Sequence, residues 1–303
     1  MMRLVRFFPA LLLLAPAAAW AHAGHPHPEP PGWSFEPWAI VPLFLALVAY
    51  LIGLARLWNR AGSSRPVVRR NAMLFLLGWF MLAGAIASPL HEAGGRSFTM
   101  HMIEHELIMM VAAPLLALSR PLGVMIWALP LRARVAAGGL GRVRAIVPLW
   151  RWMIAPVPAT VLQGIVIWAW HAPPLFSAAL RDEGWHIVQH LCFLISALLF
   201  WWAMAFGPGG ARGIGLSALC LFVTSLIGGA LGALMTFSAS PWYADYAAMG
   251  MTPYGLSPEQ DQQLAGLIMW IPGGMIHAGV ALMMLMRWFA GGARARSDAW
   301  PVQ

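Results

Sequence analysis

The sequence has few charged residues and no lysine. Charged side chains make up 10% of its 303 residues, all 19 basic residues are arginine, and apolar residues reach 60% with a mean hydropathy of +0.69. This composition excludes an ordinary soluble domain, in which about a quarter of residues are charged. The chain also lacks a Walker A sequence, a Rossmann glycine fingerprint and an H-E-x-x-H motif, so no motif indicates nucleotide binding or a zinc protease.

Cysteine is also scarce. The two cysteines, Cys192 and Cys220, fall inside long apolar segments and do not form a C-x-x-C pair. A lone thiol in such a segment behaves as a small apolar side chain. The sequence therefore predicts neither a disulfide framework nor a thiolate metal cluster.

Long apolar segments are what the chain has in abundance. A bilayer needs about 20 apolar residues per helical span. Seven segments meet this requirement: 37–57, 71–88, 98–119, 151–170, 186–206, 215–238 and 264–288. We therefore expect an all-α fold, a single polytopic bundle of seven transmembrane helices over 37–290. The loops are too short for a soluble catalytic domain, and no enzymatic activity is expected.

The arginines alternate between the two sides of this bundle. Fifteen lie in the loops after spans one, three, five and seven, whereas the opposite loops hold only Arg96 and Arg181. By the positive-inside rule, the arginine-rich side is cytoplasmic, which places the N-terminus outside and a tail at 291–303 inside. The net charge of +8 is thereby explained by orientation in a lipid bilayer. No nucleic-acid partner is expected.

The N-terminus fits that orientation. Arg3 and Arg6 precede an apolar run, and Ala19-Trp-Ala21 resembles a cleavage site, so residues 1–21 are predicted to be a signal peptide or signal anchor of a bacterial inner-membrane protein. Residues 22–36 are expected to form an extended, proline-rich periplasmic linker. Its His22, His25 and His27 are minor candidates for copper capture.

Histidines are placed at the outer side of the predicted bundle. His101 with His105, and His186 with His190, are spaced i, i+4, which puts both rings of each pair on one helix face. His171 ends the fourth span at the same depth. Ionisable residues inside a membrane are costly and usually functional. These five histidines are the predicted metal ligands; His91, His277 and Met102 are weaker candidates.

The metal expected at these histidines is copper. Imidazole binds zinc, copper, iron and nickel, and the 19 methionines favour copper because thioethers bind Cu(I). Most methionines would simply fill the core. Haem is the alternative ligand, and Glu104 is either an acceptor that orients a ring or an ordinary first-turn carboxylate.

Three blocks of the sequence resemble the CtaG family, assembly factors of caa3-type haem–copper cytochrome c oxidases. The resemblance runs from about residue 37 to 290. The first block is His101-Met102-Ile-Glu-His105 with Pro114-Leu-Leu, and the second is Trp170-His171-Ala-Pro173 with His186-x-x-x-His190 and Phe200-Trp201-Trp202. The third is Pro241-Trp-Tyr243-x-x-Tyr246 with Asp261-Gln-Gln-Leu-Ala-Gly266-Leu-Ile-Met269-Trp270.

This resemblance implies a membrane protein needed for oxidase maturation. We expect it to bind copper at the outer face and to deliver it to cytochrome c oxidase subunits, with periplasmic copper chaperones as further partners. Two alternatives stay open: a haem-binding membrane redox protein, and a copper transporter with a path along Met269, Met275 and His277. The outer loop 239–262, which contains Asp245, Glu259 and Asp261, is a candidate docking surface.

Overall fold

A computed structural model describes residues 30–140, 146–207 and 210–298, which form helices and no strand. The all-α class is therefore confirmed for these residues. The predicted signal segment 1–21 and the linker histidines His22, His25 and His27 lie outside the described residues, as do the last five residues of the predicted tail.

The long helices carry the apolar segments. They are α1 (Pro37–Trp58), α2 (Arg65–Ala87), α9 (Pro156–His171), α11 (Glu183–Phe206), α12 (Gly210–Thr236), α14 (Pro258–Asp298), and a run of α4 (Phe98–Glu106), the π-helix η2 (Leu107–Ala112) and α5 (Ala113–Ser119). Shorter helices connect them: η1 (Gly62–Ser64), α3 (Pro89–Gly94), α6 (Pro121–Met125), η3 (Ile126–Ala128), α7 (Leu131–Leu140), α8 (Ile146–Met153), α10 (Pro173–Arg181) and α13 (Ala244–Met249).

Six of the described helices are long and apolar enough to cross a membrane, and a seventh span results if α8 and α9 are counted together. These two helices meet at an angle of 66°. The break arises at Pro156, because proline disfavours the helical conformation of the residue before it. Ala155 is accordingly extended, with φ −77° and ψ 142°. The predicted span 151–170 is therefore a bent pair, and the described residues contain six to seven candidate spans.

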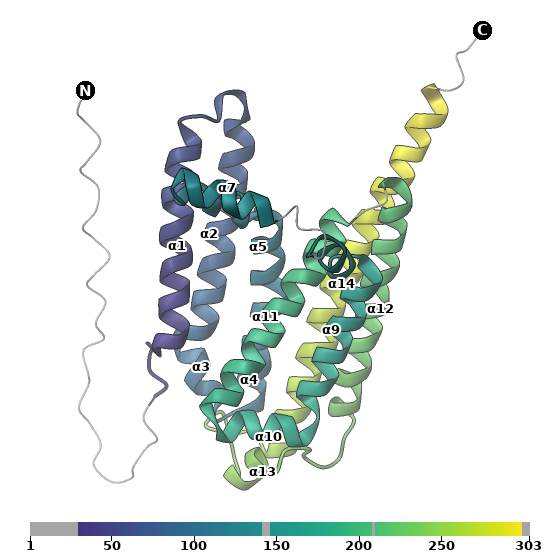
Figure 1. Cartoon of the computed structure of the whole chain (residues 1–303). Coiled ribbons are helices and arrows are strands. Elements are labelled where there is room, and N and C mark those ends of the chain that lie inside the picture. Colours follow the sequence, from purple (N-terminus) through teal and green to yellow (C-terminus); the bar gives the residue numbers. More distant parts are fainter. Residues whose placement is uncertain (1–29, 141–145, 208–209, 299–303) are drawn as a thin grey trace. The chain divides into compact units, whose positions relative to one another are not determined.

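The short helices gather at the two ends of the bundle. Figure 1 shows α3, α10 and α13 at one end, and the α1–α2 turn with α7 at the other. Successive connections between the long helices thus lie at alternate ends of the bundle, as the sequence predicts. This arrangement places the starts of α4 and α11 near α3 and α10, far from the arginine-bearing α1–α2 turn.

The α4–η2–α5 run separates two apolar cores. One face contributes Met102, Met109 and Ala113 to a core shared with α9, α11, α12 and α14. The other face contributes Ile108 and Leu116 to a core shared with α1 and α2. Because this run has buried residues on both faces, its polar side chains are held inside the protein.

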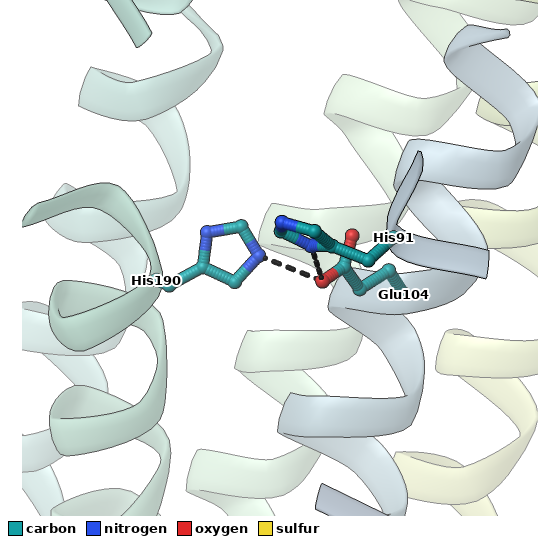
Figure 2. Close-up of side chains that lie close together, drawn as sticks. All are labelled: His91, Glu104 and His190. Carbon is teal, nitrogen blue, oxygen red and sulfur yellow. Dashed lines mark hydrogen bonds and ion pairs between the residues drawn. The ribbon is translucent and has the colours of Figure 1, made fainter. Parts of the chain in front are cut away.

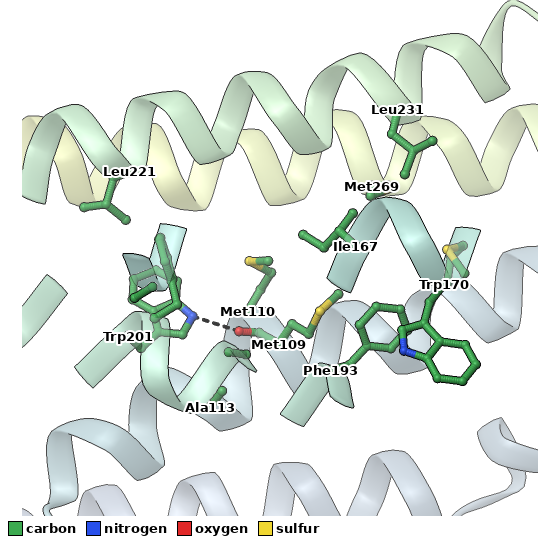
Figure 3. Close-up of a cluster of buried hydrophobic side chains, with 14 of the residues drawn as sticks. Met109, Met110, Ala113, Ile167, Trp170, Phe193, Trp201, Leu221, Leu231 and Met269 are labelled. Atoms are coloured by element: carbon green, nitrogen blue, oxygen red, sulfur yellow. Dashed lines mark hydrogen bonds between the residues drawn. The ribbon is translucent and has the colours of Figure 1, made fainter. Parts of the chain in front are cut away.

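Pro114 explains how the π-helix is tied to α11. In η2 the Ala113 N–H donates a hydrogen bond to the Ile108 carbonyl, five residues back. If this pattern continued, the backbone nitrogen of residue 114 would donate to the Met109 carbonyl. Pro114 has no N–H to give. The indole N–H of Trp201 donates to the Met109 carbonyl instead, at 2.9 Å (Figure 3). The buried carbonyl is thereby satisfied from a neighbouring helix.

Helices α12 and α14 pack closely through glycine. A Cβ on Gly266 would lie 2.5 Å from the Gly232 carbonyl oxygen and 2.8 Å from the Thr236 nitrogen. Small residues let membrane helices approach in this way. Only glycine therefore fits at position 266 without moving the two backbones apart.

Gly266→Ala is expected to destabilise the protein by about 1–3 kcal/mol, the usual cost of overpacking. The matched control is Gly279→Ala on the same helix, because a Cβ there meets nothing within 4 Å. Thermal unfolding of the two purified variants in detergent measures the difference. Equal midpoints would contradict the close approach of α12 and α14.

Candidate metal centre

Helix α4 brings three polar side chains to one face. His101, Glu104 and His105 are spaced i, i+3 and i+4, and all three are buried, with exposed fractions of 2%, 0% and 1%. The helix begins at the Ser97 cap, whose Oγ accepts a hydrogen bond from the Met100 N–H. The three side chains therefore sit within the first turns of a well-capped helix.

An acid from α14 fixes the start of α4. The Asp261 carboxylate accepts hydrogen bonds from the Phe98 N–H at 2.6 Å, the Thr99 N–H at 3.1 Å and the Ser97 hydroxyl at 2.8 Å. A helix N-terminus carries unpaired N–H groups and partial positive charge, so a buried carboxylate is well placed there. Asp261 thus sets the position of the helix that carries His101, Glu104 and His105.

Helix α11 supplies the second histidine pair. Asp182 caps this helix by accepting from the Trp185 N–H at 2.9 Å. His190 is buried and its Nδ1 donates to the His186 carbonyl at 3.1 Å, while the His186 ring is half-buried. The backbone hydrogen bond orients the His190 ring and directs its Nε2 away from α11.

Helix α3 adds a further ring to the same place. The His91 ring stacks on His186 with centroids 5.2 Å apart and lies 5.8 Å from His190. His105 lies 5.1 Å from His190, and His101 lies 5.8 Å from His186. We call these five histidines together with Glu104 the outer cluster. The two predicted pairs, from helices 85 residues apart in sequence (101 to 186), thus converge.

Glu104 lies at the centre of the outer cluster. Its Oε1 accepts a hydrogen bond from His91 Nδ1 at 2.8 Å and contacts His190 Nε2 at 3.1 Å (Figure 2). Burial of the His91 ring lowers its pKa, but the hydrogen bond to Glu104 and its negative charge outweigh burial, so the net shift of the His91 pKa is upward. Ligand atoms of His91, Glu104 and His190 all lie within 4.8 Å of one another, close enough to hold one ion.

The contact between His190 and Glu104 requires a proton or a metal ion between the two atoms. His190 Nδ1 uses its N–H on the His186 carbonyl, so a neutral ring would point the Nε2 lone pair at the Glu104 oxygen. Two acceptors facing each other in a buried site repel. A proton or a metal ion between them removes the repulsion, which makes the geometry compatible with either.

Several buried polar atoms of this region lack a hydrogen-bond partner among the described residues. They are His101 Nε2, Glu104 Oε2, both ring nitrogens of His105, and His171 Nε2. Buried polar atoms without partners are rare in proteins, and groups of them are often places that bind a water molecule or an ion. The donor set of neutral imidazoles and one carboxylate fits a first-row transition metal such as copper or zinc.

The other predicted ligands are not members of the outer cluster. His171 contacts Phe176 and Phe193, at 6.3 and 6.0 Å, and these two rings contact His101 and His105 respectively. Within the described chain it has no ring contact with another histidine. Met102 is buried in the apolar core, and His277 lies deeper, stacked on Trp201. The metal-binding role of each of these residues stays a prediction.

Sequence reasoning underestimated Glu104 and His91. The spacing of Glu104 relative to His101 and His105 already places it on their face, so periodicity alone could have identified it. No comparable signal exists for His91. Its position depends on the packing of the short helix α3 against α4, which is a tertiary contact that sequence periodicity does not report.

The outer loop 239–262 is less acidic at its surface than its sequence suggests. Asp261 is 2% exposed and caps α4. The Asp245 carboxylate accepts from Arg181 Nε at 2.7 Å, and this hydrogen bond lowers the pKa of Asp245. Two of the three acids of the proposed docking surface are thus engaged within the protein, so the loop presents little unpaired negative charge.

Comparison with known proteins places the chain in a family. The model of the cytochrome c oxidase caa3 assembly factor family matches residues 48–291. An uncharacterized protein of Mycobacterium leprae is 26% identical over 89% of this chain, and uncharacterized proteins of Mycobacterium bovis and Mycobacterium tuberculosis are each 28% identical over 83% of it.

These matches cover only 40–42% of the relatives' own length, so the chain spans about two fifths of the curated relatives it matches. No solved structure matches the chain. The family match, in contrast, covers all six residues of the outer cluster and the whole of α3, α4 and α11, which carry them. The chain therefore belongs to the cytochrome c oxidase caa3 assembly factor family, CtaG.

Proposed function

We propose that this assembly factor binds a copper ion in the outer cluster and passes it to a subunit of cytochrome c oxidase. The ion is cargo in this proposal and the protein is not an enzyme. Periplasmic copper chaperones are the proposed donors. The family supplies the link to the oxidase, and the outer cluster supplies the reason for copper.

One observation carries the proposal: ligand atoms of His91, Glu104 and His190 lie within 4.8 Å of one another, from three different helices. Four more imidazole nitrogens nearby are buried without partners among the described residues. Imidazole with carboxylate is a donor set that copper accepts. Copper is also the metal that a haem–copper oxidase must acquire during assembly.

Delivery requires a ligand that exchanges easily. A closed site of four buried ligands retains its metal, whereas an open position allows transfer. His186 is only half-buried and stacks on His91. We infer that these two rings form the entrance through which copper enters and leaves, and that Glu104, His105 and His190 hold the ion behind them.

The outer cluster is proposed to face the periplasm of a bacterial inner membrane. It lies at the end of the bundle where α3 and α10 are found, and the arginines of the α1–α2 turn lie at the opposite end (Figure 1). Arginine marks the cytoplasmic side. Copper destined for an oxidase would then be bound on the outer side of the membrane.

The outer cluster favours a bare ion over haem. A haem iron ligated by two histidines needs a porphyrin plane between their rings. The rings of the outer cluster are in direct contact, with neighbouring centroids from 4.3 to 6.4 Å apart. That spacing leaves no room for the macrocycle. A Soret band in the absorption spectrum of the purified protein would instead indicate bound haem.

Metal analysis of the purified protein tests the proposal. We expect copper to be retained after loading and dialysis, and Glu104→Gln to weaken its binding at least tenfold, because the variant removes the carboxylate that touches both His91 and His190. Glu183→Gln, an exposed acid at the start of α11, is the matched control and should bind as the wild type does. A wild-type protein that retains no copper would overturn the proposal.

A further inference from the structure

We propose a second copper site, selective for Cu(I), in a cavity between α4, η2, α9, α12 and α14, whose lining includes Glu106, Met109, Met110, Met269 and His277. The site uses none of the residues of the outer cluster. Its existence does not depend on copper binding there. Only its role as an inner store for the outer cluster rests on the proposed function.

The cavity is small and enclosed by polar and sulfur-bearing side chains. Its volume is about 20 Å³, and residues of α4, η2, α9, α12 and α14 line it. A space of at least about 10–15 Å³ holds one water molecule, and a single copper ion needs no more. Met109, Met110 and Met269, which line it, are 2%, 7% and 5% exposed, so these methionine side chains are shielded from lipid.

One of the residues that line this cavity is a histidine with a free ring nitrogen. His277 is 4% exposed, and its Nδ1 donates to the Gly273 carbonyl at 2.9 Å. That hydrogen bond leaves Nε2 as the lone-pair nitrogen, and Nε2 has no partner among the described residues. A neutral imidazole held in this way is preorganised as a metal ligand.

A carboxylate supplies the opposite charge. The Glu106 carboxylate lies against Gly273, where an added Cβ would be 3.0 Å from Oε2 and 3.3 Å from Oε1. Gly273 thus leaves the space that the carboxylate occupies, one helical turn from His277. Glu106 Oε2 is buried and has no partner within the described chain. A monovalent cation beside it would balance a charge that is otherwise costly in a membrane.

Trp201 holds the two sides of the cavity together. Its indole ring stacks on His277, with centroids 5.5 Å apart and planes at 4°, and its N–H donates to the Met109 carbonyl at 2.9 Å (Figure 3). The imidazole of α14 and the π-helix that carries Met109 are therefore fixed relative to each other. Preorganised ligands of this kind lower the entropic cost of binding.

The donor set selects the oxidation state. Thioether and imidazole ligands are typical of Cu(I), whereas Mg²⁺ and Ca²⁺ prefer oxygen. The outer cluster has no thioether among its six residues. The two sites thus differ in chemistry, although Glu106 directly follows His105 and Met109 is about one turn further along the same helical run.

A competition titration with Cu(I) and a chromophoric Cu(I) chelator tests the second site in the full-length protein. Four proteins are compared: wild type, the outer variant His105→Ala/His190→Ala, the inner variant Met269→Leu/His277→Gln, and all four changes together. We expect two, one, one and no equivalents of Cu(I), respectively. X-ray absorption of the outer variant should show sulfur scattering around copper, and the inner variant should not.

A matched control uses methionines of the same helix that face outward. Met275 and Met286 are 68% and 57% exposed, so Met275→Leu/Met286→Leu should bind Cu(I) as the wild type does. Leucine preserves the volume of methionine, and glutamine at 277 keeps a donor for the Gly273 carbonyl, which protects the fold. Unchanged stoichiometry in the inner variant would overturn the second site and leave the outer cluster standing. Unchanged stoichiometry in the outer variant would overturn copper binding by the outer cluster and leave the second site standing.

Discussion

Replacing His105 and His190 together with alanine is expected to abolish oxidase maturation in cells that depend on this protein. The two rings lie 5.1 Å apart, and His190 also contacts Glu104 at 3.1 Å, so the double change removes ligands from both α4 and α11. Oxidase activity in isolated membranes should fall to the level of a strain lacking the protein. Excess external copper should restore part of it, because mass action offsets a weakened site.

The control variant for this experiment removes the same number of histidines as the test variant, but from another part of the chain. His22→Ala/His25→Ala removes two histidines of the N-terminal segment and should leave activity close to normal, since such a segment would only raise the local copper concentration. An immunoblot of the membranes checks protein level, and His105→Gln/His190→Gln provides a variant that fills the space if alanine lowers that level. Normal oxidase activity in the glutamine variant would rule out the outer cluster as the delivery site.

The convergence of the two histidine pairs could be predicted from the sequence because it depends on local periodicity. A spacing of i, i+4 fixes a shared helix face, and the alternation of spans places α4 and α11 in the same direction. The apolar runs likewise predicted where most spans lie. These features need only the helix repeat and the thickness of a bilayer.

The remaining features depend on contacts between distant residues, which periodicity does not report. The central position of Glu104 requires His91 of α3 and His190 of α11 to approach it together. The inner cavity requires Gly273 to leave space for Glu106, a residue that no sequence pattern singles out. The bend at Pro156 is local, in contrast, and the two prolines at positions 156 and 158 indicate it in retrospect.

Asp261 shows most clearly how tertiary contacts change the meaning of a residue. In the sequence it belongs to an acidic outer loop, which suggested a docking surface for a partner. In the structure its carboxylate is buried and accepts hydrogen bonds from Ser97, Phe98 and Thr99, more than 160 residues away. It therefore acts on the outer cluster indirectly, by holding the helix that carries three of its residues.

Asp261→Ala is accordingly expected to destabilise the protein by at least about 2 kcal/mol, because hydrogen bonds to a buried charge are lost and two N–H groups of α4 are left unpaired. Copper binding should weaken as well, since the start of α4 would no longer hold His101 and Glu104 in place. Asp261→Asn should fall between the wild type and Asp261→Ala, because an amide oxygen still accepts from an N–H.

Glu259→Ala is the matched control, an acid of the same turn whose side chain accepts a hydrogen bond from the nearby Ser257 hydroxyl. It should unfold and bind copper as the wild type does. Thermal unfolding, combined with hydrogen exchange at the amides of Phe98 and Thr99, separates the two variants. Faster exchange at these amides in Asp261→Ala, with no change in Glu259→Ala, is the expected signature. If both variants protect these amides equally, the cap does not hold α4, and the histidines of that helix must be positioned by the packing of its two apolar faces alone.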